Sequence, residues 1–268
     1  MTVTRAFGDV TVTVGDDLVA TAEIRRPPHN FLDVVLIAAL ADAYDWLDGR
    51  ADARAIVLCS GGKNFCAGAD LTGSAGLTGS AGLTGTDGDP TAALYAQAAR
   101  LFEAQTPVVA AVQGAAVGGG LGLACAADFR VASPQARFAA NFARLGFHQG
   151  FGLSVTLPAI VGQQTALDLL CTGRRMGGAE AARIGLADRL ADAAQLRGSA
   201  RGLAAEIAAS APLAVRSIRA TMRAGLAARV RDAMAREAAE QGRLRQTADF
   251  AEGIRASAQR RPPRFEGR

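Results

Sequence analysis

Apolar and polar residues alternate in two short stretches near the start of the chain. Val10–Val14 and Leu18–Ile24 show the period of two that is typical of half-buried strands. The turn-forming residues Gly15-Asp16-Asp17 lie between them, and the dipeptide Pro27-Pro28 ends the second stretch because proline cannot continue a hydrogen-bonded ladder. The pattern predicts an antiparallel hairpin.

Longer elements follow this hairpin. Leu32, Leu36, Leu40 and Trp46 fall near helical spacing, and Asn30 stands where an N-cap is expected. Three later apolar runs are short enough to be buried strands: Ala55–Cys59, Pro107–Val112 and Phe129–Ala132. Helical patterns lie between these runs. The repeated unit is strand, strand, helix. This order indicates a mixed α/β class and differs from the simple βαβ alternation of a dinucleotide-binding fold.

The character of the chain changes from Ala191 onward. Long segments rich in Ala, Arg and Leu replace the strand patterns, and Pro212 is a candidate first residue of a helix. We expect a mostly helical part over Gly198–Ala258, followed by an extended basic tail. The predicted division is a core over residues 1–197 and a helical region over 198–268.

Composition narrows the function classes. Half of the 268 residues are apolar and 20% are charged, which suits one large core. No apolar run reaches the roughly 20 residues needed to cross a bilayer, and the N-terminal segment lacks the pattern of a signal peptide, so we expect a cytoplasmic protein with no membrane partner. The net charge of +4 is spread over dispersed arginines with few aromatic residues, which argues against nucleic acid as a partner. The positive surplus would suit a polyanionic small molecule.

The cysteine pattern excludes some kinds of site. The four cysteines form no CxxC pair, so neither a disulfide framework nor a zinc site is expected. Cys66 stands in a glycine-rich turn and is a candidate nucleophile. Its activation would need a nearby base, and the local sequence shows none.

Two glycine-rich segments carry the strongest chemical signal. Gly61–Leu71 follows the strand that ends near Cys59, and Gly114–Leu123 follows the strand that ends near Val112. Glycine lets the backbone approach a ligand closely. The second segment leads into a helical pattern, so its glycines would lie at a helix N-terminus, where free N–H groups and partial positive charge gather. Two such turns side by side could direct two amides at one oxygen. Neither segment fits a P-loop.

In this order and spacing, the motifs resemble the enoyl-CoA hydratase/isomerase (crotonase) family from about Val10 to Phe265. The matching segments are Arg26–Asn30, Phe65–Leu71, Ala111–Gly114 with Gly118–Gly120, Ala126–Ala132, Ile160–Gly162, Thr172–Arg174, Ala181 with Gly185–Ala187, and Arg260–Phe265. The resemblance implies an α/β fold with a crotonase-like ββα spiral core that holds an acyl-CoA site. It also implies a helical C-terminal trimerisation region, and a homotrimer or a dimer of trimers.

The resemblance assigns roles to residues. The N–H groups of Ala69 and Gly119 would form an oxyanion hole for the thioester carbonyl of an acyl-CoA. Coenzyme A would arrive as part of the substrate, with no other cofactor and no metal. The further positions expected to contact substrate are Arg26, His29, Ala67, Asp70, Leu71, Gly118, Gly122, Asn141 and Phe142.

The sequence departs from the family at the residues that move protons. Hydratases of the family use two glutamates, and the corresponding positions here are Gly122 and Phe142, neither of which can transfer a proton. His148, one of two histidines, is the candidate replacement base, because neutral imidazole accepts a proton near pH 7. A structural or exposed histidine, and proton transfer assisted by the substrate, are the alternatives.

Several functions fit this combination. The first is an enoyl-CoA hydratase- or isomerase-like enzyme without the usual glutamates. The alternatives are an acyl-CoA decarboxylase, a thioester hydrolase, or a catalytically weak protein that binds acyl-CoA. The repeat LTGSAG over Leu71–Gly85 is interpreted either as a flexible insertion or as a lid beside the site.

Overall fold

The computed structural model describes residues 2–70 and 90–268. The substrate contact predicted for Leu71, and both interpretations of the Leu71–Gly85 repeat, lie outside the described residues.

A seven-stranded sheet forms the centre of the described part of the chain. Its first three strands are antiparallel and the remaining four add in parallel. In spatial order the strands are β1 (Val3–Phe7), β2 (Val10–Val14), β3 (Val19–Ile24), β4 (Ala55–Ser60), β5 (Val108–Val112), β7 (Phe129–Ala132) and β10 (Arg189–Leu190). The predicted hairpin and the three predicted buried strands are confirmed. Strand β1 was not predicted, because its central residues are exposed and polar on an edge strand.

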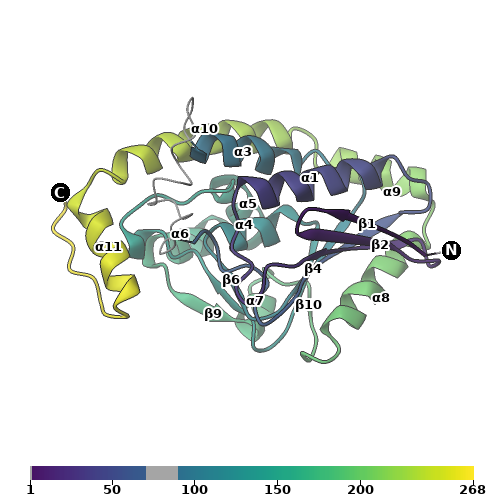
Figure 1. Ribbon diagram of the computed structural model, residues 1–268, viewed down its shortest axis with the longest axis horizontal. Helices are drawn as coiled ribbons and strands as arrows, with labels where there is room; N and C mark the ends of the chain where they lie inside the picture. The colour runs from purple at the N-terminus through teal and green to yellow at the C-terminus, as the bar shows by residue number, and fades with distance from the viewer. Residues whose placement is uncertain (1, 71–89) are drawn as a thin grey trace.

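Side chains of the sheet alternate between two apolar layers. In β4, Ile56 and Leu58 face the larger core, whereas Val57 and Cys59 face a smaller cluster beneath α8 (Leu196–Ala208). Figure 1 shows α8 on one side of the sheet, and α1 (Val34–Asp48) and α3 (Pro90–Arg100) on the other. Both faces of the parallel strands are therefore covered, which explains their continuous apolar runs.

A second sheet of three short strands completes the repeat that the sequence indicates. It contains β6 (Ala115–Val117), β8 (Arg137–Ala139) and β9 (Arg175–Gly177). Strands β5 and β6 lead into α4 (Gly119–Ala126), and β7 and β8 lead through a short 3₁₀ turn, η1 (Ala143–Leu145), into α5 (Leu153–Val161). The ββα repeat of a spiral core is confirmed. Helices α6 (Gln163–Thr172) and α7 (Gly178–Arg183) come before β10.

The expected role of Asn30 as an N-cap is wrong. Helix α1 begins at Val34, and the carboxylate of Asp33 accepts the capping hydrogen bond from the Leu36 N–H at 2.8 Å. Asn30 is fully buried with φ +50°, and its amide donates to the carbonyls of Gly61 at 2.8 Å and Asn64 at 2.7 Å. Its side chain joins two loops, a contact between distant segments that local sequence rules do not reveal.

The helical C-terminal region is confirmed, and Pro212 is the first residue of its helix. After α8 come α9 (Pro212–Met222), α10 (Leu226–Leu244) and α11 (Ala248–Ala258). Helix α10 lies along α3, as Figure 1 shows, and also contacts α5. The predicted division at residues 197 and 198 stays an interpretation, and it falls inside α8.

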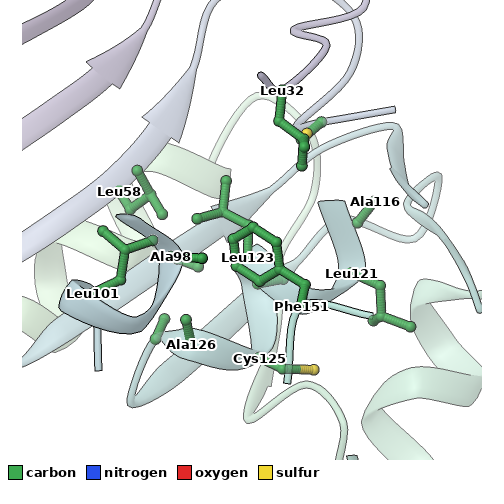
Figure 2. Close-up of a cluster of buried hydrophobic side chains, with 14 of the residues drawn as sticks. Leu32, Leu58, Ala98, Leu101, Ala116, Leu121, Leu123, Cys125, Ala126 and Phe151 are labelled. Carbon is green, nitrogen blue, oxygen red and sulfur yellow. The ribbon is translucent and has the colours of Figure 1, made fainter. Parts of the chain in front are cut away.

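Apolar side chains from several elements meet behind α4. Figure 2 shows Leu58 of β4 and Leu101, after α3, in one buried cluster with Leu121 and Leu123 of α4 and with Phe151. These residues are no more than 2% exposed. The packing fixes α4, and with it the glycines at its N-terminus.

Candidate active site

The two glycine-rich segments are bound to each other through their backbones. The Phe65 N–H donates to the Gln113 carbonyl at 2.8 Å, and the Cys66 N–H donates to the Ala115 carbonyl at 2.9 Å. In return, the Val117 N–H donates to the Cys66 carbonyl at 3.1 Å. This short parallel ladder sets the separation of the two turns that follow it.

Glycine is required at two positions beside this ladder. Gly118 has φ +56° and ψ −120°, a conformation open to glycine alone. A Cβ on Gly120 would lie 2.0 Å from the Cys66 carbonyl oxygen, so only glycine permits this approach of α4 to the first segment. Gly118 and Gly120 therefore allow the backbones of the two glycine-rich segments to come into contact.

The contact places the end of the first segment, Gly68 and Ala69, beside Gly119. A Cβ built on Gly68 would stand 2.8 Å from the Val117 carbonyl oxygen and 3.9 Å from the Gly119 nitrogen. Gly119 is the first residue of α4, so its N–H has no partner within the helix. Neither N–H donates a backbone hydrogen bond within the described part of the chain. The two donors are thus available to a ligand oxygen.

Both residues line a cavity of about 70 Å³ with mostly apolar walls. Among the described residues, three polar side chains line it, and none of its lining side chains is a carboxylate, a histidine, a lysine or an arginine. The polar ones are Tyr95, Asn141 and Gln241; the others that line it are Leu32, Ala67, Gly68, Ala69, Leu94, Val117, Gly118, Gly119, Phe142, Leu145, Phe147, Gly150 and Phe151. Apolar walls of this kind lower the local dielectric constant and strengthen a hydrogen bond made inside the cavity.

Comparison with known proteins agrees with this geometry. Residues 16–268 match the family described as Enoyl-CoA hydratase/isomerase. The chain belongs to the enoyl-CoA hydratase/isomerase family. It is an enzyme of this class that acts on acyl-CoA.

Relatives and solved structures of the enoyl-CoA hydratase/isomerase family cover nearly the whole chain. A carnitinyl-CoA dehydratase from Proteus mirabilis is 35% identical over 250 residues, which are 91% of this chain and 93% of that protein. The crystal structure of an enoyl-CoA hydratase/isomerase from Pseudoalteromonas atlantica T6c has a TM-score of 0.84 and 30% identity, covering 97% of this chain and 100% of the other. An enoyl-CoA hydratase from Mycobacterium avium subsp. paratuberculosis has a TM-score of 0.80 and 26% identity, covering 97% and 99%.

Aromatic rings lie at or beside Gly122 and Phe142, the two positions at which the sequence resemblance leads one to expect glutamates in a hydratase. A Cβ on Gly122 would lie 2.6 Å from the Cβ of Phe151, which is 1% exposed. Phe142 is buried and packs edge-on against Phe147, with ring centroids 5.5 Å apart. Phe142, Phe147 and Phe151 thus form an apolar wall of the cavity, whereas Gly122 is not among its lining residues and leaves the room that the Phe151 ring takes.

The structure does not bring the His148 side chain to the described lining of the cavity. Its Nδ1 lies 2.8 Å from the Gln149 carbonyl oxygen, and its own carbonyl accepts a hydrogen bond from Gln241 at 2.9 Å. The neighbours Phe147 and Gly150 line the cavity, whereas His148 is not among the lining residues. Its role as a base stays a prediction with no geometric support here.

Residues expected at the coenzyme A end lie on the loop before α1. Arg26 forms ion pairs with Asp9 and Asp33, and the distance from its Nη1 to the Asp33 carboxylate is 2.6 Å. His29 is exposed and packs against Phe31, with ring centroids 5.2 Å apart. Their contacts with substrate stay predictions.

Two more predicted contacts lie on the first glycine-rich segment. Ala67 lines the cavity, and its N–H donates to the His29 carbonyl at 3.0 Å, which fixes the segment beside the loop before α1. Asp70 is half-buried directly after Ala69.

Cys66 lies beside the hole and is fully buried. Burial raises the pKa of its thiol to about 12, although the backbone N–H groups of Gly68 and Leu32 point toward the sulfur. A thiol with this pKa carries almost no thiolate at neutral pH. The reading of Cys66 as a nucleophile therefore has no support, and the residue holds the turn that carries Ala69.

Sequence reasoning missed two of the polar groups in the cavity. Tyr95 lies on α3 and Gln241 lies on α10, far apart along the chain. The Tyr95 hydroxyl donates to the Gln241 side-chain oxygen at 3.2 Å. Neither residue belongs to a motif, and the only sequence signal was that Tyr95 is one of two tyrosines.

Proposed function

We propose that this enzyme holds the thioester carbonyl of an acyl-CoA between the N–H groups of Ala69 and Gly119 and stabilises the oxyanion formed there. The observation that carries the proposal is that Ala69 and Gly119, whose N–H groups have no backbone acceptor among the described residues, line the same apolar cavity. Donors fixed in this way stabilise negative charge as it develops, and losing one typically lowers the rate by about 10²–10³.

The reaction class that best fits is hydratase- or isomerase-like chemistry that does not use the two-glutamate route to water. Phe142 and the Phe151 ring against Gly122 support this, because they leave no carboxylate at the two positions and exclude water from that wall. Protons would then move through the substrate or through a group outside the described lining. Ordinary hydration of crotonyl-CoA should be slow.

Decarboxylation of an acyl-CoA is the second candidate. Among the described residues, no carboxylate, imidazole or amine lines the cavity to remove a proton. Loss of CO₂ produces an enolate without a protein base, and an apolar cavity disfavours the carboxylate of the starting ester. Thioester hydrolysis, and binding without turnover, are further outcomes that the same experiment separates.

We also propose a homotrimer or a dimer of trimers. Helix α9 has no buried residue, and Leu213, Ile218 and Met222 are 82%, 64% and 80% exposed. An exposed apolar row of this kind supports association with another subunit. Light scattering tests the mass of the assembly in solution.

Within the described residues no helix is long and apolar enough to span a membrane. A cytoplasmic location stays a prediction.

The proposed activity can be tested with a panel of acyl-CoA esters analysed by mass spectrometry. Crotonyl-CoA, a 3-enoyl-CoA, 3-hydroxybutyryl-CoA and methylmalonyl-CoA report hydration, isomerisation, dehydration and decarboxylation, and free coenzyme A reports hydrolysis. We expect turnover of at least one ester, with crotonyl-CoA hydrated far below about 10³ s⁻¹, the upper end of common enzyme rates. Failure of every ester to bind or react would refute the proposal.

A further inference from the structure

The polar side of the cavity is built by two side chains that meet at Gly150. A Cβ added to Gly150 would lie 1.8 Å from the Tyr95 hydroxyl and 2.6 Å from Gln241 Nε2. Any side chain at position 150 would displace both groups. Gly150, Tyr95 and Gln241 all line the cavity that contains the oxyanion donors.

The structure holds this pair firmly. The Tyr95 hydroxyl donates to Gln241 Oε1 at 3.2 Å, and Gln241 Nε2 donates to the His148 carbonyl at 2.9 Å. The same Oε1 accepts a hydrogen bond from Arg245 at 3.3 Å. Tyr95 is 8% exposed and Gln241 is 2% exposed, so their positions are set by packing of α3 on α10.

The pair keeps hydrogen-bonding capacity that these contacts do not use. A phenol oxygen has two lone pairs, of which the backbone N–H of Phe151 takes one in Tyr95, and a primary amide has two N–H groups. Gln241 Nε2 donates one of its two hydrogens to the His148 carbonyl, and the second N–H has no partner among the described residues. Burial, and then the negative charge of Glu237, raise the pKa of Tyr95, so its hydroxyl stays neutral. The pair thus offers one acceptor and one donor, both uncharged.

We propose that Tyr95 and Gln241 determine specificity by binding a neutral hydroxyl group on the acyl chain. The ligand hydroxyl donates its hydrogen to the Tyr95 oxygen and accepts the remaining N–H of Gln241. A carboxylate on the chain is disfavoured, because no cationic side chain among the described residues lines the cavity. This inference rests on the proposed acyl-CoA site and names the acyl group that the site selects.

The discrimination should be moderate. An ester without the hydroxyl loses both hydrogen bonds to the pair, but Tyr95 and Gln241 stay bonded to each other, so no buried group is left wholly unpaired. Each neutral hydrogen bond corresponds to roughly fivefold in affinity, so the preference should be at least about fivefold. A charged chain end should bind still more weakly than the plain ester.

Calorimetry of the full-length protein tests this. The probes are butyryl-CoA, both enantiomers of 3-hydroxybutyryl-CoA, 4-hydroxybutyryl-CoA and succinyl-CoA. The variant is Tyr95→Phe, and the matched control is Tyr44→Phe. Tyr44, the other tyrosine, is also buried, but it lies on α1 and does not line the cavity. Thermal unfolding of each variant confirms that it is folded.

We expect one or more of the hydroxy esters to bind wild type at least about fivefold more tightly than butyryl-CoA, and succinyl-CoA to bind most weakly. Tyr95→Phe should remove the preference while keeping the affinity for butyryl-CoA, and Tyr44→Phe should leave both unchanged. Equal binding of hydroxy esters and butyryl-CoA by wild type, or a preference that survives Tyr95→Phe, would overturn the inference alone. Binding of no ester would instead refute the acyl-CoA site itself.

If Tyr95→Phe does not fold, Gly150→Ala provides a second variant. Its methyl group would occupy the place of the Tyr95 hydroxyl and push the pair out of the cavity. Loss of the preference for a hydroxy ester is expected here too, and an unchanged preference would overturn the inference.

Discussion

The proposed oxyanion hole and the aromatic wall of the same cavity are built in opposite ways. The hole consists of backbone N–H groups held by a short ladder between two glycine-rich segments. The wall consists of packed side chains, with Phe151 against Gly122 and Phe142 against Phe147. By the sequence resemblance, the first region keeps the motifs expected of the enoyl-CoA hydratase/isomerase family, whereas the second lacks the two expected glutamates.

This difference separates binding from proton transfer. A backbone hole depends on local conformation, so it persists while the side chains around it change. Stabilising an oxyanion is common to many reactions of thioesters, whereas the acid and base decide which reaction follows. The hole is therefore expected to be common to the family, whereas the aromatic wall is expected to decide the reaction and its specificity.

Breaking the contact between the two segments should have the largest effect. In Gly120→Ala, the methyl group would meet the Cys66 carbonyl oxygen at 2.0 Å and push α4 away from the first segment. We expect turnover of any ester found in the panel to fall at least about 100-fold, and the free energy of unfolding to fall by about 1–3 kcal/mol.

Gly202→Ala is the matched control for this change. Gly202 also lies within a helix, α8, and a Cβ there meets nothing within 4 Å. Turnover should be unchanged and stability should rise by about 0.5–1 kcal/mol. Normal activity in Gly120→Ala would show that the contact does not position the hole.

Restoring a glutamate beside the wall should fail. In Gly122→Glu, the new side chain would collide with Phe151, whose Cβ lies 2.6 Å from the added Cβ. We expect a loss of about 1–3 kcal/mol in unfolding free energy and no gain in hydration of crotonyl-CoA. Chemical denaturation and a hydration assay measure these, with Gly202→Glu as the exposed control. Faster hydration would show that the wall can accept the two-glutamate route.

Removing the charge of Glu237, which supports the turn that carries Phe151, should have a smaller effect on the protein than the glycine substitutions. The Glu237 carboxylate accepts hydrogen bonds from the Gly152 N–H at 2.8 Å and the Ser154 hydroxyl at 2.6 Å, which fixes the turn that carries Phe151. Glu237→Gln places an N–H group toward these donors and should lower stability by about 2 kcal/mol. Denaturation measures this against Glu240→Gln, which removes a surface ion pair with Arg243 worth about 0–1 kcal/mol. Equal losses would contradict the supporting role.

Removing the imidazole of His148 should have the smallest effect. The side chain does not line the described cavity, so His148→Ala should change turnover by less than about twofold; a functioning general base typically contributes about 10²–10⁴. Steady-state kinetics decide between the two. A loss of 100-fold would assign His148 the role of base and require the loop to move.

The parts of the molecule that follow from local rules could be predicted from the sequence. Alternation predicted β2 and β3, and continuous apolar runs predicted β4, β5 and β7. The glycines predicted the turns that carry Ala69 and Gly119, because Gly118 and Gly120 meet local conformational and steric demands. Tertiary contacts could not be predicted in this way. Asn30 joins two loops and does not cap a helix, and Tyr95 meets Gln241 only because α3 packs on α10.

The position of His148 shows the same limit. His148 was predicted as the base because a neutral imidazole accepts a proton near pH 7. The direction of its ring, however, depends on how the loop after η1 packs against α10. The absence of glutamates was readable from the sequence. The sequence did not reveal that the ring of Phe151 lies beside Gly122.

Infrared spectroscopy of bound crotonyl-CoA carrying ¹³C at the thioester carbonyl tests the central claim most directly, because it detects the hole whether or not the ester reacts. If the Ala69 and Gly119 N–H groups both donate to the carbonyl oxygen, the carbonyl stretch should move to a lower frequency on binding, and the shift should disappear in Gly120→Ala. A bound ester whose carbonyl absorbs at the same frequency as in water would contradict the account.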